Sequence, residues 1–223
     1  MKLVHIGYNL EINIQENQIN VITVENQKAY TEILCDLWNQ TNGLEGEFIL
    51  SDRDKIKDIS KEMECIFNPF ELNVNDKKTI TSLHKELNEN SNEMFYDKAS
   101  ILNTHIINFI DELIQTVPYP IKYNPDLDVL NMLKLLHVEM DIQADTLLES
   151  IIDYIRVMRQ ICKITKFVFI GLKNYLTEKE LELLYEFVFY QKVSLIIIQP
   201  IQCSILNNEK NLIIDKDLCI ITL

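Results

Sequence analysis

Several carboxylates in the middle of the chain have the chemistry of a calcium site. Asp126 and Asp128 stand at a proline-marked helix start, and Glu139, Asp141, Asp145 and Glu149 follow on the next segments. Carboxylate oxygens are hard ligands of the kind that Ca2+ prefers. The spacing does not match an EF-hand loop, and acids also gather at helix N-termini because the helix dipole favours them there. Calcium ligands and solvated acids are therefore both open interpretations.

Two groups of basic side chains could contact phosphate. The first follows the end of a predicted strand and consists of Arg53, Lys55, Lys57 and Lys61. The second recurs every three or four residues along a predicted helix and consists of Arg156, Arg159, Lys163 and Lys166. Such cations position a protein on DNA without reading bases. The alternative is a solvated helix face with ion-pair partners such as Asp58 and Glu62.

Other familiar catalytic patterns are missing from the sequence. The chain holds only four glycines, at 7, 43, 46 and 171, and no GxxxxGK[ST] loop follows any predicted strand. The sequence therefore has no glycine-rich loop whose backbone N–H groups could bind phosphate, which argues against ATP or GTP hydrolysis. No HExxH or GxSxG motif occurs either, and the five cysteines form no CxxC pair.

The charge balance restricts how this chain can meet nucleic acid. The formal net charge is −13, whereas sequence-independent DNA affinity comes from cations that displace condensed counterions. Any DNA contact must therefore be local. Residues 64–149 carry 15 acidic and 6 basic side chains, so the middle is the acidic part. No apolar run approaches the roughly 20 residues that span a bilayer, and we expect a cytoplasmic protein without a membrane partner.

The N-terminal part predicts strands around one helix. Residues 2–24 alternate apolar and polar side chains, which favours short antiparallel strands. Asn26 is a predicted helix cap, followed by apolar residues at helical spacing, and a strand is expected at 47–50.

The middle of the chain changes to helical periodicity. From Asp76 to about Cys162 nearly everything fits 3.6 residues per turn. Residues 88–92 form a predicted polar break, and three prolines end the second helix before a third begins near Asp126. We expect a helical insertion into an α/β domain.

The C-terminal part predicts a mononucleotide-fold core. A helix from Asp145 leads into a buried strand at 167–170, a helix opened by the capping box of Thr177 and Glu180, and a second buried strand at 195–198. Right-handed crossovers would make these strands parallel. A hairpin of 211–214 and 218–221 ends the chain, and the fold class expected is α/β.

Four segments resemble a known family when they are taken in order. They are PFELNVNDKKTITSLHKEL (69–87), LDVLNMLKLLHVEMD (127–141), KFVFIGLKNYLTEKELELLYEFVFYQKVSLIIIQP (166–200) and LIIDKDLCIITL (212–223). The chain is similar to the small spacer-acquisition proteins specific to type II-A CRISPR-Cas systems. The likeness covers nearly the full chain.

This resemblance implies a non-enzymatic protein that binds double-stranded DNA ends as a homotetrameric ring and works with other CRISPR adaptation and effector proteins. It implies a head like a P-loop ATPase without Walker motifs, made of residues 1–68 and 150–223, and an inserted helical leg of residues 69–149. Structural Ca2+ would be bound by Asp126, Asp128, Glu139 and Asp141, and no nucleotide is expected. Arg53, Lys55, Lys57 and Lys61 become the leading DNA candidates, and Arg156, Arg159 and Lys163 are further candidates.

Two other function classes stay open from the sequence. The leg carboxylates could serve a metal-dependent nuclease, since metal ions activate water for phosphodiester cleavage. The chain could also be an oligomeric adaptor that never touches DNA. Linear and closed circular duplexes, tested with and without metal ions, distinguish these classes.

Overall fold

The structure is a computed structural model that describes residues 1–53, 55–125 and 127–223. The chain divides into two compact units. Unit 1 contains Met1–Val74 and Ile142–Leu223, and unit 2 contains Asn75–Asp141. Unit 1 is a mixed α/β structure, as the sequence predicts, and unit 2 is helical.

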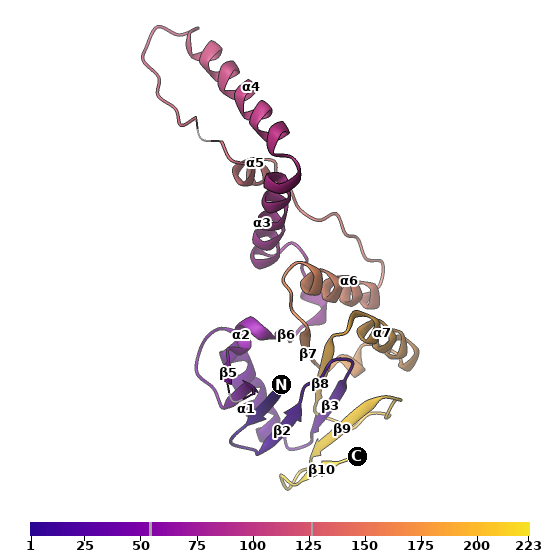
Figure 1. Cartoon of the computed structure of the whole chain (residues 1–223). Helices are drawn as coiled ribbons and strands as arrows, with labels where there is room; N and C mark the ends of the chain where they lie inside the picture. The colour runs from indigo at the N-terminus through magenta and orange to yellow at the C-terminus, as the bar shows by residue number, and fades with distance from the viewer. Residues whose placement is uncertain (54, 126) are drawn as a thin grey trace. The chain divides into compact units, whose positions relative to one another are not determined.

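Unit 1 is built on a six-stranded sheet (Figure 1). In spatial order its strands are β10 (Ile220–Thr222), β9 (Glu209–Ile214), β3 (Ile19–Val24), β8 (Ser194–Gln199), β7 (Lys166–Ile170) and β6 (Glu64–Ile66). All neighbours are parallel except β10 and β9, which form an antiparallel hairpin. The predicted parallel strands and the closing hairpin are thereby confirmed.

A second, four-stranded sheet in unit 1 is antiparallel. Its strands in spatial order are β2 (Leu10–Asn13), β1 (Lys2–His5), β4 (Phe48–Asp52) and β5 (Lys55–Lys57). The prediction that residues 19–24 join this antiparallel group is wrong, because β3 lies between β8 and β9 in the large sheet. All six residues of β3 are buried, as a strand covered on both faces requires.

Both faces of the large sheet are apolar and both are covered. Along β7, Phe167 and Phe169 pack with helices α6 (Leu147–Gln160) and α7 (Glu178–Gln191). Val168 and Ile170 face the other way, toward α1 (Gln27–Thr41) and the small sheet. The alternation of side chains along a strand therefore produces two cores, one on each side of the sheet.

The ends of the helices in unit 1 follow their capping residues. Thr177 and Glu180 form the predicted capping box of α7, and Thr146 with Glu149 forms a second one that opens α6. The predicted start at Asp145 therefore lies one residue before the cap, because the Thr146 hydroxyl accepts the N–H of Glu149. The short helix α2 (Ile59–Glu62) and two 3-10 turns, Pro69–Glu71 and Leu172–Asn174, complete this unit.

Unit 2 contains α3 (Lys77–Met94), α4 (Tyr96–Ile114) and α5 (Val129–Leu135). The predicted polar break at 88–92 is wrong, since α3 runs through it and ends at Met94, with Phe95 as its C-terminal cap. Polar residues interrupt the apolar stripe there, but the backbone hydrogen bonds of the helix continue. Residues 115–125 and 136–141 are not helical, so helical periodicity overstated the helix content of this region.

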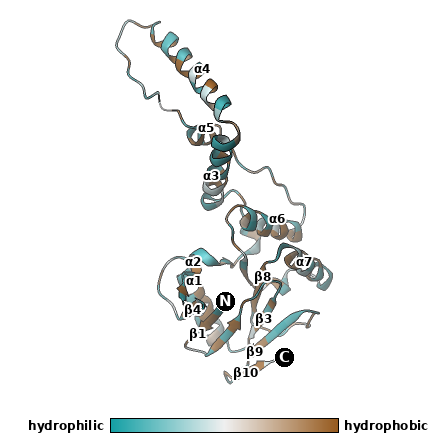
Figure 2. Cartoon of the chain, viewed as in Figure 1, coloured by the Kyte–Doolittle hydropathy of each residue, from teal (hydrophilic) through white to brown (hydrophobic). Residues whose placement is uncertain are grey.

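Hydropathy differs between the parts of the chain (Figure 2). The central strands of unit 1 carry hydrophobic residues, whereas α3 is mostly hydrophilic. No helix among the described residues is both long and apolar enough to cross a membrane.

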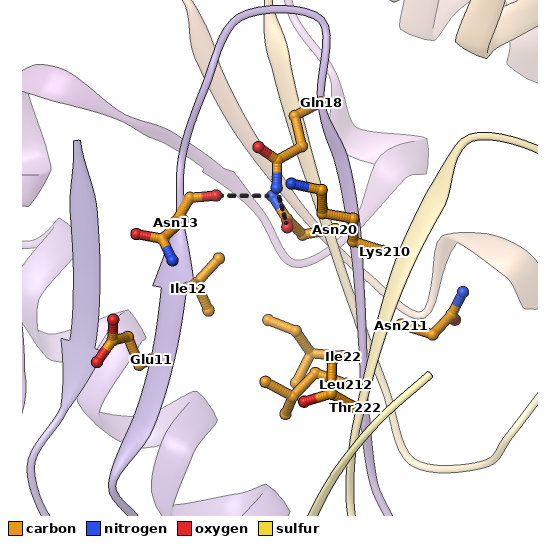
Figure 3. Close-up of a pocket in the computed structure, with 10 residues that line it drawn as sticks. All are labelled: Glu11, Ile12, Asn13, Gln18, Asn20, Ile22, Lys210, Asn211, Leu212 and Thr222. Atoms are coloured by element: carbon orange, nitrogen blue, oxygen red, sulfur yellow. Dashed lines mark hydrogen bonds between the residues drawn. The ribbon is translucent and has the colours of Figure 1, made fainter.

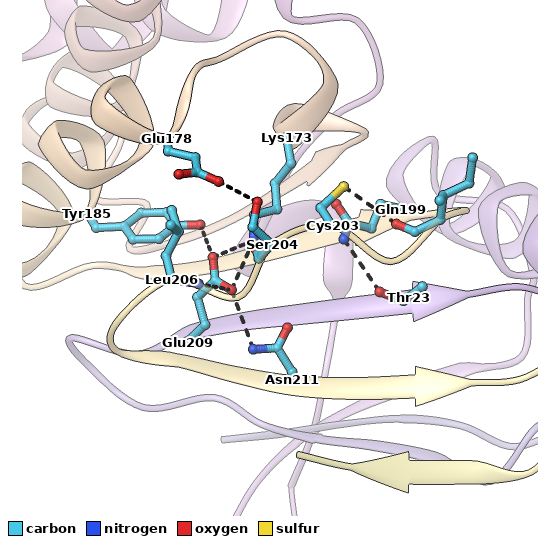
Figure 4. A network of polar contacts seen from close by, with 11 residues as sticks. Thr23, Lys173, Glu178, Tyr185, Gln199, Cys203, Ser204, Leu206, Glu209 and Asn211 are labelled. Carbon is cyan, nitrogen blue, oxygen red and sulfur yellow. Dashed lines mark hydrogen bonds and ion pairs between the residues drawn. The ribbon is translucent and has the colours of Figure 1, made fainter.

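A buried ion pair joins separate elements of unit 1 (Figure 4). The Lys173 ammonium lies 2.7 and 2.9 Å from the two carboxylate oxygens of Glu209, and the side chains are only 3% and 0% exposed. The Tyr185 hydroxyl donates to the same carboxylate at 2.7 Å, and Lys173 also donates to the Ser204 carbonyl. Burial and the bond to Glu209 raise the pKa of Tyr185 well above its usual value. The network ties the turn after β7 to α7 and β9.

We expect Lys173→Met to destabilise unit 1 by about 3–5 kcal/mol, because it leaves the Glu209 charge buried without its partner. Urea unfolding would measure the loss. The double variant Lys173→Met/Glu209→Leu removes both charges and should recover much of it. A single variant as stable as the parent chain would show that the pair does not stabilise the fold.

Candidate nucleic-acid interface

The leading basic group lies on an edge strand and a short helix. Lys55 and Lys57 are in β5, the last strand of the small sheet, and Lys61 is in α2 (Ile59–Glu62). Arg53 occupies the turn before β5 with a left-handed backbone, at a φ of 44°. Arg53 and Lys55 are exposed, and within the described residues neither forms an ion pair. Lysines also protect edge strands from unwanted pairing, so exposure alone does not identify their role.

Lys57 and Lys61 have local acidic partners. The Lys61 ammonium lies 3.1 Å from Asp58, the residue that caps α2. Hydrogen bonds from Ser60 and Lys61 hold the pKa of the Asp58 carboxyl below its usual range. Asp58 therefore stays charged and offsets Lys61, as the ion-pair alternative for this group predicts.

Glu62 brings the two basic groups together. Its carboxylate lies 3.6 Å from the Lys57 ammonium and 3.7 Å from the Lys166 ammonium. Lys166 begins β7, next to β6 at the edge of the large sheet, and α2 connects β5 to β6. The cluster thus forms where the edges of the two sheets meet. Lys57 and Lys166 are far apart in the sequence, so nothing in local spacing indicates that one carboxylate serves both.

The other cations of the second basic group are engaged along α6. Arg156 pairs with Asp153 and lies over the Phe187 ring, with its guanidinium carbon 5.6 Å from the ring centroid. Arg159 donates through Nε to the carbonyl of Gln191, the last residue of α7, where a cation also suits the helix dipole. Lys163 donates to the Gln160 carbonyl at 2.6 Å. Arg156 and Arg159 therefore connect α6 to α7, and Lys163 bonds locally at the end of α6. As DNA contacts, the three side chains stay predictions.

The start of α1 is the place where a mononucleotide fold would hold phosphate, because this helix follows the central strand β3. Here the Asn26 side-chain oxygen accepts the N–H groups of Lys28 and Ala29, each at 3.1 Å. The side-chain nitrogen of Asn26 donates to the Lys216 carbonyl at 2.9 Å. Two of the backbone donors at the start of this helix are thereby occupied by the protein itself.

The predicted calcium ligands lie in unit 2, and Asp126 is outside the described residues. Asp128 caps α5, accepting the N–H of Asn131 at 2.7 Å. Glu139 and Asp141 are exposed, and their carboxylate oxygens fit the chemistry of Ca2+. Among the described residues, no group of three or more His, Cys, Asp or Glu side chains could hold a metal ion. A complete site would need further oxygen ligands.

Side chains from α3 and its start hold the segment that carries Glu139 and Asp141. Asn75 pairs with the backbone of Met140 through two hydrogen bonds of 2.9 Å, one in each direction. The His84 ring, which is 4% exposed, donates from Nε2 to the Val138 carbonyl at 2.7 Å. Val138 and Met140 are half-buried while the two acids between and after them are exposed, which fits an extended chain.

A polar cleft opens between the two sheets of unit 1 (Figure 3). It has a volume of about 220 Å³ and its lining comes from β2, β3, β9, β10 and the turn before β3. Buried carboxamides dominate its polar wall: the Gln18 side chain donates to Asn20 at 2.7 Å. Lys210 is the one cation in that lining. Glu11 offsets that charge, so the lining has no net charge to attract phosphate, and none of the predicted site residues lines the cleft.

Comparisons with known proteins agree with the fold. The sequence model described as CRISPR-associated protein (Cas_Csn2) matches residues 40–218. CRISPR-associated protein Csn2 of Streptococcus agalactiae is 23% identical over 203 residues, which cover 88% of this chain and 87% of that protein. The crystal structure of Stu0660 of Streptococcus thermophilus matches with a TM-score of 0.64 at 14% identity, covering 100% of this chain and 76% of that chain.

We expect Asn26→Ala to lower the free energy of unfolding by about 1 kcal/mol, because two N–H groups at the start of α1 lose their acceptor. Thermal unfolding would measure this loss. Asn26→Asp keeps the acceptor and serves as the matched control. Equal stability of Asn26→Ala and the parent chain would contradict the assigned cap.

Proposed function

The chain belongs to the CRISPR-associated Cas_Csn2 family, and we propose that it acts in spacer acquisition as a non-enzymatic protein that binds the ends of double-stranded DNA. In this proposal it works in the cytoplasm with other CRISPR adaptation and effector proteins. The α/β unit would be a head of P-loop-ATPase type without Walker motifs, and the helical unit would be its leg.

The basic cluster at the meeting edges of the two sheets supports DNA binding. It joins Lys55 and Lys57 of β5 to Lys166 of β7 in a protein whose net charge is −13. Each ammonium can contact a phosphate without reading bases. This gathering of cations from both sheets is the observation that carries the proposal.

Electrostatics would then account for a preference for DNA ends. A protein that is acidic overall repels the side of a duplex, and a local basic surface inside a ring accepts a duplex that enters by its end. Binding should be steeply salt-dependent and indifferent to sequence, because only counterions are released.

The proposal of a non-enzymatic, nucleotide-free role is supported by the capped start of α1. Asn26 takes the N–H groups of Lys28 and Ala29, and no glycine-rich loop precedes the helix. A fold does not carry the chemistry of its relatives without the residues of the site.

Calcium and ring assembly complete the proposal. Glu139 and Asp141 would contribute carboxylate oxygens to a structural Ca2+, with Asp126 and Asp128 as further candidate ligands. The ion would neutralise acidic side chains that otherwise repel one another, and so would stabilise a homotetramer.

We expect Lys55→Glu/Lys57→Glu to weaken binding to linear duplex and to lower the slope of log affinity against log salt by roughly 2, at about 0.9 per phosphate contact. Mobility shifts over a salt series would measure both. The control Lys28→Glu/Lys179→Glu changes the net charge by the same amount, but its two positions lie on α1 and α7. It should therefore leave the salt slope near that of the parent chain. Equal losses in both double variants would remove β5 from the interface.

The same mobility shifts distinguish the other function classes. Linear duplex should bind and closed circular duplex should not, with no strand cleavage in Mg2+ or Mn2+. Cleavage that disappears in Asp126→Ala would establish the nuclease instead. An absence of binding to both duplexes at low salt would favour the adaptor that never touches DNA.

We expect Glu139→Gln/Asp141→Asn to weaken Ca2+ binding at least tenfold, because two charged ligands become neutral. Isothermal titration would measure affinity, and sedimentation would measure the tetramer fraction with calcium or a chelator. Glu86→Gln/Glu89→Gln on α3 is the matched control. Unchanged calcium affinity would exclude this segment as the site.

A further inference from the structure

We infer that Lys57 and Lys166 form a phosphate-binding site in which Glu62 occupies the place of the DNA phosphate until DNA arrives. This inference rests on the proposed DNA binding and deepens it in two ways. Lys57 and Lys166 share a single phosphate, and Glu62 is an internal competitor that sets the strength of the site.

The geometry around Glu62 resembles a bound anion between two cations. The two ammonium groups come from different sheets and reach different oxygens of one carboxylate: Lys57 meets Oε1 at 3.6 Å and Lys166 meets Oε2 at 3.7 Å. A phosphate group also presents several oxygens that separate donors can share. The three side chains together have a charge of +1, so the site stays attractive to an anion.

The contacts are loose enough to exchange. Charge-assisted N–H···O bonds are about 2.7–2.9 Å long, and both ammonium–carboxylate distances here are longer. The fixed cation Lys173, by contrast, approaches its carboxylate to 2.7 Å in a fully buried pair. Glu62 holds its lysines near one another without binding them tightly.

The solvent exposure of the three side chains permits a ligand to enter. The Lys57 and Glu62 side chains are 37% and 31% exposed, and Lys166 is 15% exposed. Lys166 is therefore held within the fold, with its ammonium 3.5 Å from the Thr165 hydroxyl. A partly buried cation loses less conformational freedom when it binds than a fully exposed one.

The position of Glu62 explains why it can yield to phosphate. It is the last residue of α2, a helix of four residues that joins the edges of the two sheets. A rotation of its side chain would release both lysines without moving any strand. A phosphate would then replace the carboxylate at the junction of β5 and β7.

The test is a comparison of duplex affinity in Glu62→Gln and Lys166→Gln. Glu62→Gln removes the competing charge and should tighten binding to linear duplex about two- to fivefold, the range expected of a surface ion pair. Lys166→Gln should weaken binding and lower the salt slope by about 0.9. Fluorescence anisotropy of a labelled linear duplex would measure both, and thermal unfolding would confirm that each variant is folded.

Glu11→Gln is the matched control, because it changes the net charge by the same amount as Glu62→Gln. Glu11 of β2 also forms an ion pair, with Lys2 of β1 at 2.7 Å. Equal tightening in Glu11→Gln and Glu62→Gln would show a general charge effect and overturn the inference. No tightening in Glu62→Gln would overturn it as well, while normal binding by the parent chain would leave the proposed function intact. An absence of binding by the parent chain would refute the proposed function itself, and this inference with it.

A further titration distinguishes DNA phosphate from free phosphate. Inorganic phosphate, compared with chloride at equal ionic strength, should compete weakly with duplex, because a single phosphate lacks the other contacts. If inorganic phosphate bound the parent chain in a Lys166-dependent way while Lys166→Gln left duplex affinity unchanged, the site would serve free phosphate and the inference would be wrong.

Discussion

The large parallel sheet must be covered on both faces, and the arrangement of unit 1 follows from that constraint. Phe167 and Phe169 require cover on one side, and Val168 and Ile170 require it on the other. Helices α6 and α7 cover the first face, while α1 and the small antiparallel sheet cover the second. Because the small sheet is part of this cover, its edge strand β5 comes near β6 and β7. The cluster of Lys57, Glu62 and Lys166 is a consequence of that packing.

The sequence predicted the helix starts and buried strands that capping residues and continuous apolar runs determine locally. Thr177 and Glu180 identified the start of α7, and continuous apolar runs identified β7 and β8. The partners of β3 could not be predicted in this way, because its neighbours come from the other end of the chain. Helical periodicity failed at residues 88–92, where a change in the stripe looks like a break although the backbone continues.

The sequence predicted which basic residues could belong to the candidate site, but not what each of them contacts. Residue types and spacing identified both basic groups, but spacing could not separate cations that bind the fold from cations open to a ligand. Arg159 and Lys166 both belong to the regularly spaced second basic group, yet Arg159 donates to the backbone at the end of α7.

The start of α1 offers few free backbone donors for an anion. There the Asn26 side chain uses the backbone donors, so anion binding in this fold would rest on flexible ammonium groups. Such groups suit a ligand that varies in sequence and slides, whereas fixed N–H groups suit one defined phosphate.

The central position of β3 has a consequence for how the chain folds during synthesis. Its two neighbours, β8 and β9, begin at Ser194 and Glu209, so both pairings close loops of more than 170 residues. Contacts of such long sequence separation form slowly. Proteins are made from the N-terminus, and β1, β2 and β4 can pair early, while Ile19–Val24 waits without a strand partner. A nascent chain that has not yet reached Ser194 therefore holds an apolar strand without either of its partners in the large sheet.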